Sequence, residues 1–342
     1  MSDYYESRQH LNLSQFAFDT IESDKYIFQD KPSLARILNW IFSMYRDYAD
    51  ASIENACFRY REQIETFVKS VPQSTDKENT ITALIDSYKM ELIKTANSYP
   101  REHQFKFQLD RQNYKYIMDW RDPEGAYDGV PGRFIKAVLE EYARKPLVER
   151  ESILFKDLIE LVEACVESHL SLTLTLSNGT RYEVRPYGVL TDKGNNYHYL
   201  VGYSRRVGEK AEDKQSSFRI SNIREYKLYF GRSGKLTEKE KRSMEHRINS
   251  VGVQFLLQEP DRIRVRLSKQ GKTMYESQAH LRPEFISREL EESGDWVYEF
   301  NCTQIQAQYF FFKFGADAEI LCPSELREHF ANSYYEAYNL YS

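Results

Sequence analysis

Cysteine is scarce in this chain, which carries four in 342 residues, far apart and with no paired spacing: Cys57, Cys165, Cys302 and Cys322. A disulfide framework is therefore not expected. The sequence also lacks a signal peptide and any apolar run of about 18 residues, the length that a membrane-spanning helix needs. These absences lead us to expect a reduced, soluble cytoplasmic protein with no membrane association.

The residue patterns of catalytic and metal sites are missing as well. The seven histidines are scattered, and no two have the helical spacing of a metal-binding pair. Neither a nucleophile elbow nor a glycine-rich dinucleotide fingerprint occurs. In the segment Gly231 to Lys235 (GRSGK) the glycines are too close together for a phosphate-binding loop, and Leu236 stands where a hydroxyl residue is needed. We therefore expect no enzymatic activity, no cofactor and no metal ion.

The chain as a whole has no excess of positive charge, since its net charge is −5 and its pI is about 5.9. The segment from Ser171 to Arg232 differs, because it holds eleven Lys or Arg against six Asp or Glu, whereas the remainder holds 36 against 46. A basic module inside an acidic chain is compatible with nucleic-acid binding. Chance clustering of surface charge explains the same count equally well.

The first 165 residues contain a degenerate internal repeat. The segments His10 to Phe16 (HLNLSQF) and His103 to Asp110 (HQFKFQLD) alternate apolar and polar residues, which predicts two short strands. Helices are expected after each strand. When the helix that begins near Pro32 is aligned with the one that begins near Val130, their apolar positions coincide. Strand, helix, helix, present twice, resembles the ribbon-helix-helix fold that two subunits normally build. We expect this chain to build it alone by pairing its two strands antiparallel.

The outward face of such a ribbon would carry polar side chains able to enter a DNA major groove. They are His10, Asn12, Ser14, Gln104, Lys106 and Gln108. The ordinary surface of a solvated ribbon is the favoured interpretation of these residues, because the first strand has no Lys or Arg for phosphate contacts. The inward residues predicted to pack on the helices are Leu11, Leu13, Phe105, Phe107 and Leu109.

Further helices are expected over 51–71 and 80–99, between the copies, and over 149–168. The pattern then changes to short strands with tight turns, expected over 171–176, 181–189, 197–203, 218–220 and 223–230. Five such strands are typical of a small barrel. After a charged helix over 237–249, an α+β unit closes the chain, with 272–277 (KTMYES) predicted as a strand and 282–293 (RPEFISRELEES) as a helix.

The pattern RPYGVL, YHYLVGYS and SFRISNI, running from Arg185 to Ile223, resembles the WYL domain, named for a Trp-Tyr-Leu tripeptide. Here that tripeptide is His198-Tyr199-Leu200, and Asn222 stands where the family usually repeats an arginine, whereas Arg219 is retained. The segment from Tyr309 to Phe330 resembles the extension that follows WYL domains. The resemblance covers roughly residues 170–342 and implies a Sm-like five-stranded barrel that senses or grips nucleic acid, usually as a dimer.

A ribbon-helix-helix front joined to a WYL domain resembles the accessory proteins of type VI-D CRISPR systems, whose effectors are RNA-guided, RNA-cleaving enzymes. The Arg-x4-His motif of HEPN ribonucleases, which such an effector carries, is absent here. The resemblance implies an α+β protein in four parts. These are an intramolecular ribbon-helix-helix pseudo-dimer with a helical insert (1–168), the WYL barrel (169–232), a linker helix (233–252) and a ferredoxin-like C-terminal domain that forms a homodimer (253–342).

Single-stranded RNA requires cations along its phosphates and flat rings for its unstacked bases. The candidate cations are Arg181, Arg185, Arg205, Arg206 and Arg219, and the candidate rings are Tyr187, Tyr199 and Tyr203. Any single tyrosine is expected in the core more often than on the surface, so the prediction depends on the cluster as a whole.

The sequence therefore favours a non-catalytic accessory protein that binds single-stranded RNA and stimulates an RNA-targeting type VI-D effector. A DNA-binding transcriptional regulator whose WYL domain senses a small ligand is an alternative. A scaffold that binds the effector through its acidic helices, without touching nucleic acid, is another.

Overall fold

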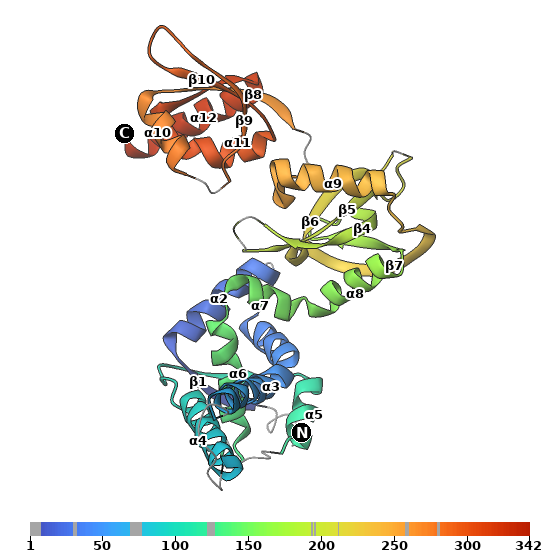
Figure 1. Cartoon of the computed structure of the whole chain (residues 1–342), viewed down its shortest axis with the longest axis vertical. Helices are drawn as coiled ribbons and strands as arrows, with labels where there is room; N and C mark the ends of the chain where they lie inside the picture. The colour runs from blue at the N-terminus through green and yellow to red at the C-terminus, as the bar shows by residue number, and fades with distance from the viewer. Residues whose placement is uncertain are drawn as a thin grey trace. The chain divides into compact units, whose positions relative to one another are not determined.

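The computed structural model describes residues 8–29, 33–68, 77–121, 127–192, 194, 196–210, 212–256, 260–278 and 281–342. Over these residues the protein is mixed α+β, with three antiparallel sheets (Figure 1). The chain divides into two compact units, Met1–Lys156 and Asp157–Ser342. None of the helices in the described ranges combines the length and the apolar character needed to cross a membrane.

The first unit contains a two-stranded ribbon and its helices. In chain order its elements are β1 (Arg8–Leu13), α2 (Gln15–Gln29), α3 (Leu34–Val68), α4 (Lys77–Asn97), β2 (His103–Gln108), α5 (Arg111–Asp119), α6 (Pro131–Arg144) and α7 (Leu147–Leu154). The predicted antiparallel pairing of the two strands is confirmed, with Leu11 opposite Phe105. The helix expected from residue 51 is the second half of the long helix α3.

Helix α6 supplies the centre of this unit's core. Proline at its first position fits a helix start, because the missing N–H would have no partner there. Its apolar stripe includes Phe134, Val138 and Tyr142, none of which is exposed to solvent. These side chains belong to one cluster with Leu11 of β1 and Phe107 of β2. The inward face of the ribbon therefore packs on the helices, as its alternation predicts.

The prediction that Ser14 lies on the outer face of the ribbon is wrong. Strand β1 ends at Leu13, and Ser14 is buried at the start of α2, where its hydroxyl accepts a hydrogen bond from the Ala17 amide at 3.2 Å. The Ser14 amide and hydroxyl donate to the two carboxylate oxygens of Glu140 at 2.6 and 2.7 Å. A residue that caps a helix turns out of the strand alternation, so the strand ends at Leu13, three residues before its predicted end at Phe16.

The second unit begins with a five-stranded sheet. Its elements are α8 (Lys156–Glu167), β3 (Leu170–Leu176), β4 (Arg181–Thr191), β5 (His198–Arg206), β6 (Lys214–Arg219), the 3₁₀ turn η1 (Ile220–Asn222), β7 (Ile223–Ser233), α9 (Glu238–Val251) and η2 (Val253–Phe255). The helix expected over 149–168 is in fact two helices, α7 and α8, separated at Phe155.

The prediction of a closed barrel is wrong. The strand order is β6-β5-β4-β3-β7, so among the described strands β6 and β7 are the two edges and do not pair with each other. Side chains link the two edges instead, because Arg232 of β7 binds Asp213, which directly precedes β6. Helix α9 covers part of one face, where Met244 and Val251 pack with Val201 and Tyr203 of β5.

The chain ends in a four-stranded sheet with helices on one face. Its elements are β8 (Asp261–Leu267), α10 (Lys269–Ser277), β9 (Phe285–Leu290), β10 (Trp296–Cys302), α11 (Gln304–Phe311), η3 (Phe312–Asp317), β11 (Ala318–Cys322) and α12 (Ser324–Tyr341), and the sheet order is β11-β8-β10-β9. In β8 the alternation works as expected, since Ile263 and Val265 are buried against the helices whereas Arg262 on the opposite face is exposed.

Two segments of this region have the opposite secondary structure to the one predicted. The segment predicted as a strand, 272–277, lies in helix α10, which Ser268 caps by accepting a hydrogen bond from the Gly271 amide at 3.0 Å. The segment predicted as a helix, 282–293, contains strand β9, which pairs with β10 so that Leu290 lies opposite Trp296. For β9, pairing with β10 outweighs local propensity, whereas α10 begins at a local cap that the strand prediction overlooked.

Candidate nucleic-acid interface

The candidate residues of the second unit lie on the adjacent strands β4, β5 and β6. Antiparallel pairing places Arg185 opposite Tyr203 and Tyr199 opposite both Leu190 and Arg219. The sheet therefore brings the predicted cations and rings together. Whether these side chains can contact RNA depends on the helix and the loops that pack beside them.

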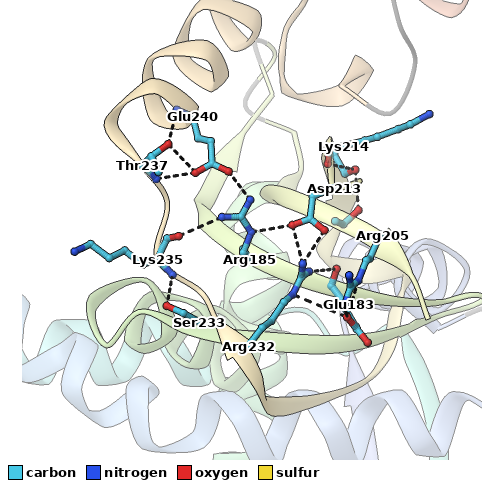
Figure 2. A network of polar contacts seen from close by, with 12 residues as sticks. Glu183, Arg185, Arg205, Asp213, Lys214, Arg232, Ser233, Lys235, Thr237 and Glu240 are labelled. Carbon is cyan, nitrogen blue, oxygen red and sulfur yellow. Dashed lines mark hydrogen bonds and ion pairs between the residues drawn. The ribbon is translucent and has the colours of Figure 1, made fainter. Parts of the chain in front are cut away.

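Arg185 lies inside a network of polar contacts, shown in Figure 2. Its Nε donates to Asp213 Oδ2 at 2.8 Å, its Nη1 donates to the Lys235 carbonyl at 3.2 Å, and its Nη2 donates to the Glu240 carboxylate. The side chain is 16% exposed. These contacts tie β4 to the loop before β6 and to the first turn of α9.

Two further arginines complete the network (Figure 2). Arg232 Nη1 donates to both carboxylate oxygens of Asp213 at 2.7 Å. Arg205 donates to Glu183 Oε2 from Nε and Nη2, at 2.9 and 2.7 Å. Asp213 therefore bridges two arginines that come from different strands, β4 and β7.

Two carboxylates of the network, Asp213 and Glu240, are held in their charged forms. Burial opposes ionisation of Asp213, but the hydrogen bonds from Arg232 and Arg185 outweigh it and lower the pKa of this carboxyl. For Glu240, the hydrogen bond from Arg185 and those from Thr237 lower the pKa to about 2. The same carboxylate closes a capping box, since Glu240 accepts from the Thr237 amide and hydroxyl while the Thr237 hydroxyl accepts from the Glu240 amide.

The tyrosines of this surface face helix α9. Tyr203 is 9% exposed, and its hydroxyl donates to the Glu240 carbonyl oxygen at 3.0 Å. Tyr187 is half-buried and donates to Glu245 Oε1 at 3.2 Å. Tyr199 packs against the apolar cluster that contains Met244 and Val251 of α9. The expectation of an open surface of cations and rings is therefore wrong for Arg185 and Tyr203, because α9 packs on that part of the sheet.

Three of the predicted cations lie at the end of the sheet where β4 begins and β5 ends. We call Arg181, Arg205 and Arg206 the rim arginines. Arg181 is exposed, and the side chains of Arg206 and Arg205 are 60% and 33% exposed. Arg206 lies 3.9 Å from Glu209, a distance at which an exposed ion pair contributes little stability. The fifth cation, Arg219, lies over the ring of Tyr197, 3.4 Å from its centroid.

Only some of the residues predicted on the outer face of the ribbon in the first unit are exposed to solvent. His10 pairs opposite Lys106, and Asn12 opposite Gln104. His10, Gln104 and Lys106 are exposed, Asn12 and Gln108 are half-buried, and Ser14 is buried as described above. Across the described residues of both units, no group of three or more His, Cys, Asp or Glu side chains is placed to hold a metal ion.

The comparisons with known proteins rest on structure. No family model matches the sequence, and no curated protein matches it. The whole chain resembles a solved CRISPR Cas-related protein. The similarity covers 98% of this chain and 94% of that one, with a TM-score of 0.73 and 25% sequence identity. A second similarity, to proteasome accessory factor B/C of Arthrobacter aurescens, covers 68% of this chain and 38% of that one at a TM-score of 0.29 and 13% identity, which is too low to support a conclusion.

The acidic partners of the candidate site lie far from it in the sequence. Asp213 lies 28 residues and Glu240 55 residues from Arg185, so no local pattern joins them. The available signal was the alternation of Tyr199, Val201 and Tyr203 along β5, which places two of the predicted rings on the same face as a buried valine.

Proposed function

We propose that this protein is a non-catalytic accessory protein of an RNA-targeting CRISPR system, of the type VI-D kind, that binds single-stranded RNA and stimulates the effector. The observation that carries the proposal is its similarity to a CRISPR Cas-related protein over nearly the full length of both chains. The resemblance of residues 170–342 to a WYL domain with its extension supports the RNA-binding part of the proposal.

Within this proposal the RNA phosphates contact the rim arginines. Arginine suits that role because its planar guanidinium binds phosphate with two parallel hydrogen bonds. Arg206 pairs opposite Tyr182, whose ring packs on Phe218 with centroids 4.9 Å apart, so a half-buried ring stands beside an exposed cation. The tyrosines that face α9 then hold the helix on the sheet, and they do not stack on bases.

The experiment that tests the proposal compares affinities for a labelled single-stranded RNA by fluorescence anisotropy. We expect Arg181→Ala/Arg206→Ala to weaken binding about tenfold, which corresponds to about 1.4 kcal/mol. The matched control is Lys115→Ala/Lys269→Ala, which removes the same charge from exposed positions elsewhere. Equal affinities for the two variants would show that the rim arginines are not the RNA-binding surface. If the unmodified protein does not bind RNA, the proposed RNA binding is wrong.

Stimulation of the effector is tested separately. RNA cleavage by a type VI-D effector is measured with and without the protein, and then with the rim variant. The proposal expects faster cleavage with the unmodified protein and a smaller increase with Arg181→Ala/Arg206→Ala. An increase that is the same with both would favour a scaffold that contacts the effector and not RNA.

The second candidate function is DNA-binding regulation by the ribbon. The specific observation in its favour is that the two strands pair with His10, Gln104 and Lys106 exposed, as readout of a major groove requires. Its test is a mobility shift on the promoter of the protein's own gene, compared between the unmodified protein and Gln104→Ala/Lys106→Ala. A shift that Gln104→Ala/Lys106→Ala abolishes would favour this function over RNA binding.

Finer assignments of fold and assembly belong to the same proposal. We assign the first unit to a ribbon-helix-helix pseudo-dimer, the five-stranded sheet to an opened relative of the Sm-like barrel, and the order β8-α10-β9-β10-α11-β11 to a ferredoxin-like domain. We also propose a homodimer through the C-terminal domain, where helix α12 exposes Tyr335, Tyr338 and Leu340 by 67%, 67% and 85%.

A further inference from the structure

A groove in the C-terminal domain lies between helix α10 and strand β9. Its volume is about 420 Å³, within the range of about 300–1,000 Å³ that small ligands occupy in proteins. It lies outside the five-stranded sheet and is separate from the rim arginines. The residues lining it are Tyr275, Glu276, Arg282, Glu284, Phe285 and Arg288.

Cations lie over aromatic rings throughout this groove. The guanidinium carbon of Arg282 lies 5.6 Å from the ring centroid of Tyr275. That of Arg288 lies 5.4 Å from the centroid of Phe285 and 5.3 Å from that of Trp296. Outside the lining residues, Lys272 Nζ lies 4.5 Å from the centroid of the same Trp296 ring. Rings and cations interleaved in this way are what proteins use to hold unstacked nucleotides.

One part of the groove is fixed and another is open to solvent. Tyr275 is buried, its hydroxyl donates to the Pro283 carbonyl at 2.8 Å, and its ring packs 5.2 Å from that of Tyr298. In contrast, Phe285 is 42% exposed and the Arg288 side chain 43% exposed. The buried tyrosine therefore provides a rigid floor, and the accessible ring and guanidinium group are available to a ligand.

The groove holds two cations that can contact a single phosphate. Its lining sets Arg282 and Arg288 against two carboxylates, Glu276 and Glu284, so these charges balance, and Lys272 lies 3.7 Å from Glu276 outside the lining. Glu276 lies 3.7 Å from Lys272 and 3.9 Å from Arg288 and is 54% exposed, so these are weak surface ion pairs that a phosphate can replace.

We propose that this groove binds one unpaired nucleotide, with its base on Phe285 and its phosphate between Arg282 and Arg288. The ligand chemistry is a planar base joined to one phosphate, which either an RNA strand or a free mononucleotide supplies. For the RNA strand, this inference rests on the proposed function and adds a second contact to the rim arginines.

The first test measures RNA affinity against salt for two variants. Arg282→Ala/Arg288→Ala should weaken binding about tenfold and make the slope of log affinity against log salt shallower by about 0.7 for the phosphate lost. Phe285→Ala should weaken binding by about fivefold or more through lost stacking, with the slope unchanged. The matched control is Arg262→Ala/Arg264→Ala, which removes two arginines from the opposite face of the same sheet. Affinities equal to that control would overturn the RNA arm.

The second test locates the contact and separates the two sources of ligand. RNA carrying 4-thiouridine is cross-linked to the unmodified protein, and a cross-link in the peptide from Leu281 to Trp296 is expected. Isothermal titration with adenosine monophosphate follows, comparing the unmodified protein with Phe285→Ala. If no RNA binds but the nucleotide does, and Phe285→Ala abolishes its binding, the proposed function fails and the nucleotide site stands. If RNA binds with no cross-link in this peptide and no loss in either groove variant, the groove proposal fails and the proposed function stands.

Discussion

Arg185 of strand β4 donates to the carboxylate of Glu240 in the first turn of helix α9, and Glu240 closes the cap of that helix through Thr237. One carboxylate therefore fixes both the start of α9 and its attachment to the sheet. The Tyr203 hydroxyl bonds to the backbone carbonyl of the same residue, so ring, cation and helix meet at one point. This joint explains why a surface that looks like an RNA contact in the sequence is an internal contact in the structure.

The first prediction concerns Glu240 and pH. Because the hydrogen bond from Arg185 lowers the pKa of this carboxyl from 4.5 to about 2, its contribution to stability is complete above pH 4.5 and is lost as pH falls from 4.5 toward 2. Glu240→Gln should reduce stability at pH 7 by about 1–2 kcal/mol. The loss should be smaller at pH 3.

Urea unfolding followed by circular dichroism at pH 7 and pH 3 measures this difference. Glu238→Gln is the matched control, because Glu238 lies on the same turn with its side chain 76% exposed. A loss of stability that is the same at both pH values would show that the charge of Glu240 does not hold α9.

The second prediction separates two arginines that the sequence groups together. Arg185→Ala leaves the carboxylates of Asp213 and Glu240 without one of their donors and should destabilise the protein by about 2–4 kcal/mol. Arg206→Ala removes an exposed side chain and should change stability by less than about 0.5 kcal/mol. RNA affinity should follow the opposite order. Thermal unfolding and anisotropy on the same samples check both, and an Arg185→Ala protein that stays stable but loses RNA binding would contradict the assignment.

The third prediction concerns the buried contact that joins the two repeats of the first unit. Glu140 is fully buried and accepts from the Ser14 amide, the Ser14 hydroxyl and Arg144. Glu140→Ala should destabilise the unit by about 3 kcal/mol, because three donors lose their acceptor. Differential scanning calorimetry should show a lower melting temperature than for Glu91→Ala, an exposed carboxylate on α4. Equal melting temperatures would show that this contact does not hold β1 on α6.

The fourth prediction concerns assembly. If helix α12 forms the dimer contact, Tyr335→Glu/Tyr338→Glu, three residues apart on one face of the helix, places two charges in an apolar interface and should give a monomer. Light scattering after size-exclusion chromatography measures the mass directly. Glu328→Lys/Glu336→Lys, on exposed positions of the same helix, controls for changes of charge. A dimer that survives Tyr335→Glu/Tyr338→Glu would place the contact elsewhere.

Patterns that depend on nearby residues predicted the fold well. The ribbon follows from period-two alternation, because Leu11 and Leu13 must share a face if the strand is regular. The charged helix α9 follows from Thr237 and Glu240, whose spacing is that of a capping box. By contrast, α10 was predicted as a strand and β9 as a helix. Strand β9 depends on its pairing with β10, which local propensity does not report.

The candidate site was harder to predict than the fold. The sequence placed Arg185 and Tyr203 on adjacent strands correctly, but which face α9 would cover depends on Met244 and Val251 packing on β5. The sequence also could not predict whether the five-stranded sheet closes into a barrel. Whether β6 meets β7 depends on how far five short strands curl, and Asp213 joins the edges through side chains.

The most direct test of the central claim is the salt dependence of single-stranded RNA affinity, measured for the unmodified protein and for Arg181→Ala/Arg206→Ala. The account predicts that log affinity falls linearly with log salt, and that the slope of the variant is shallower by about 1.4, since each lost phosphate contact contributes about 0.7. Identical slopes for the two proteins would contradict it.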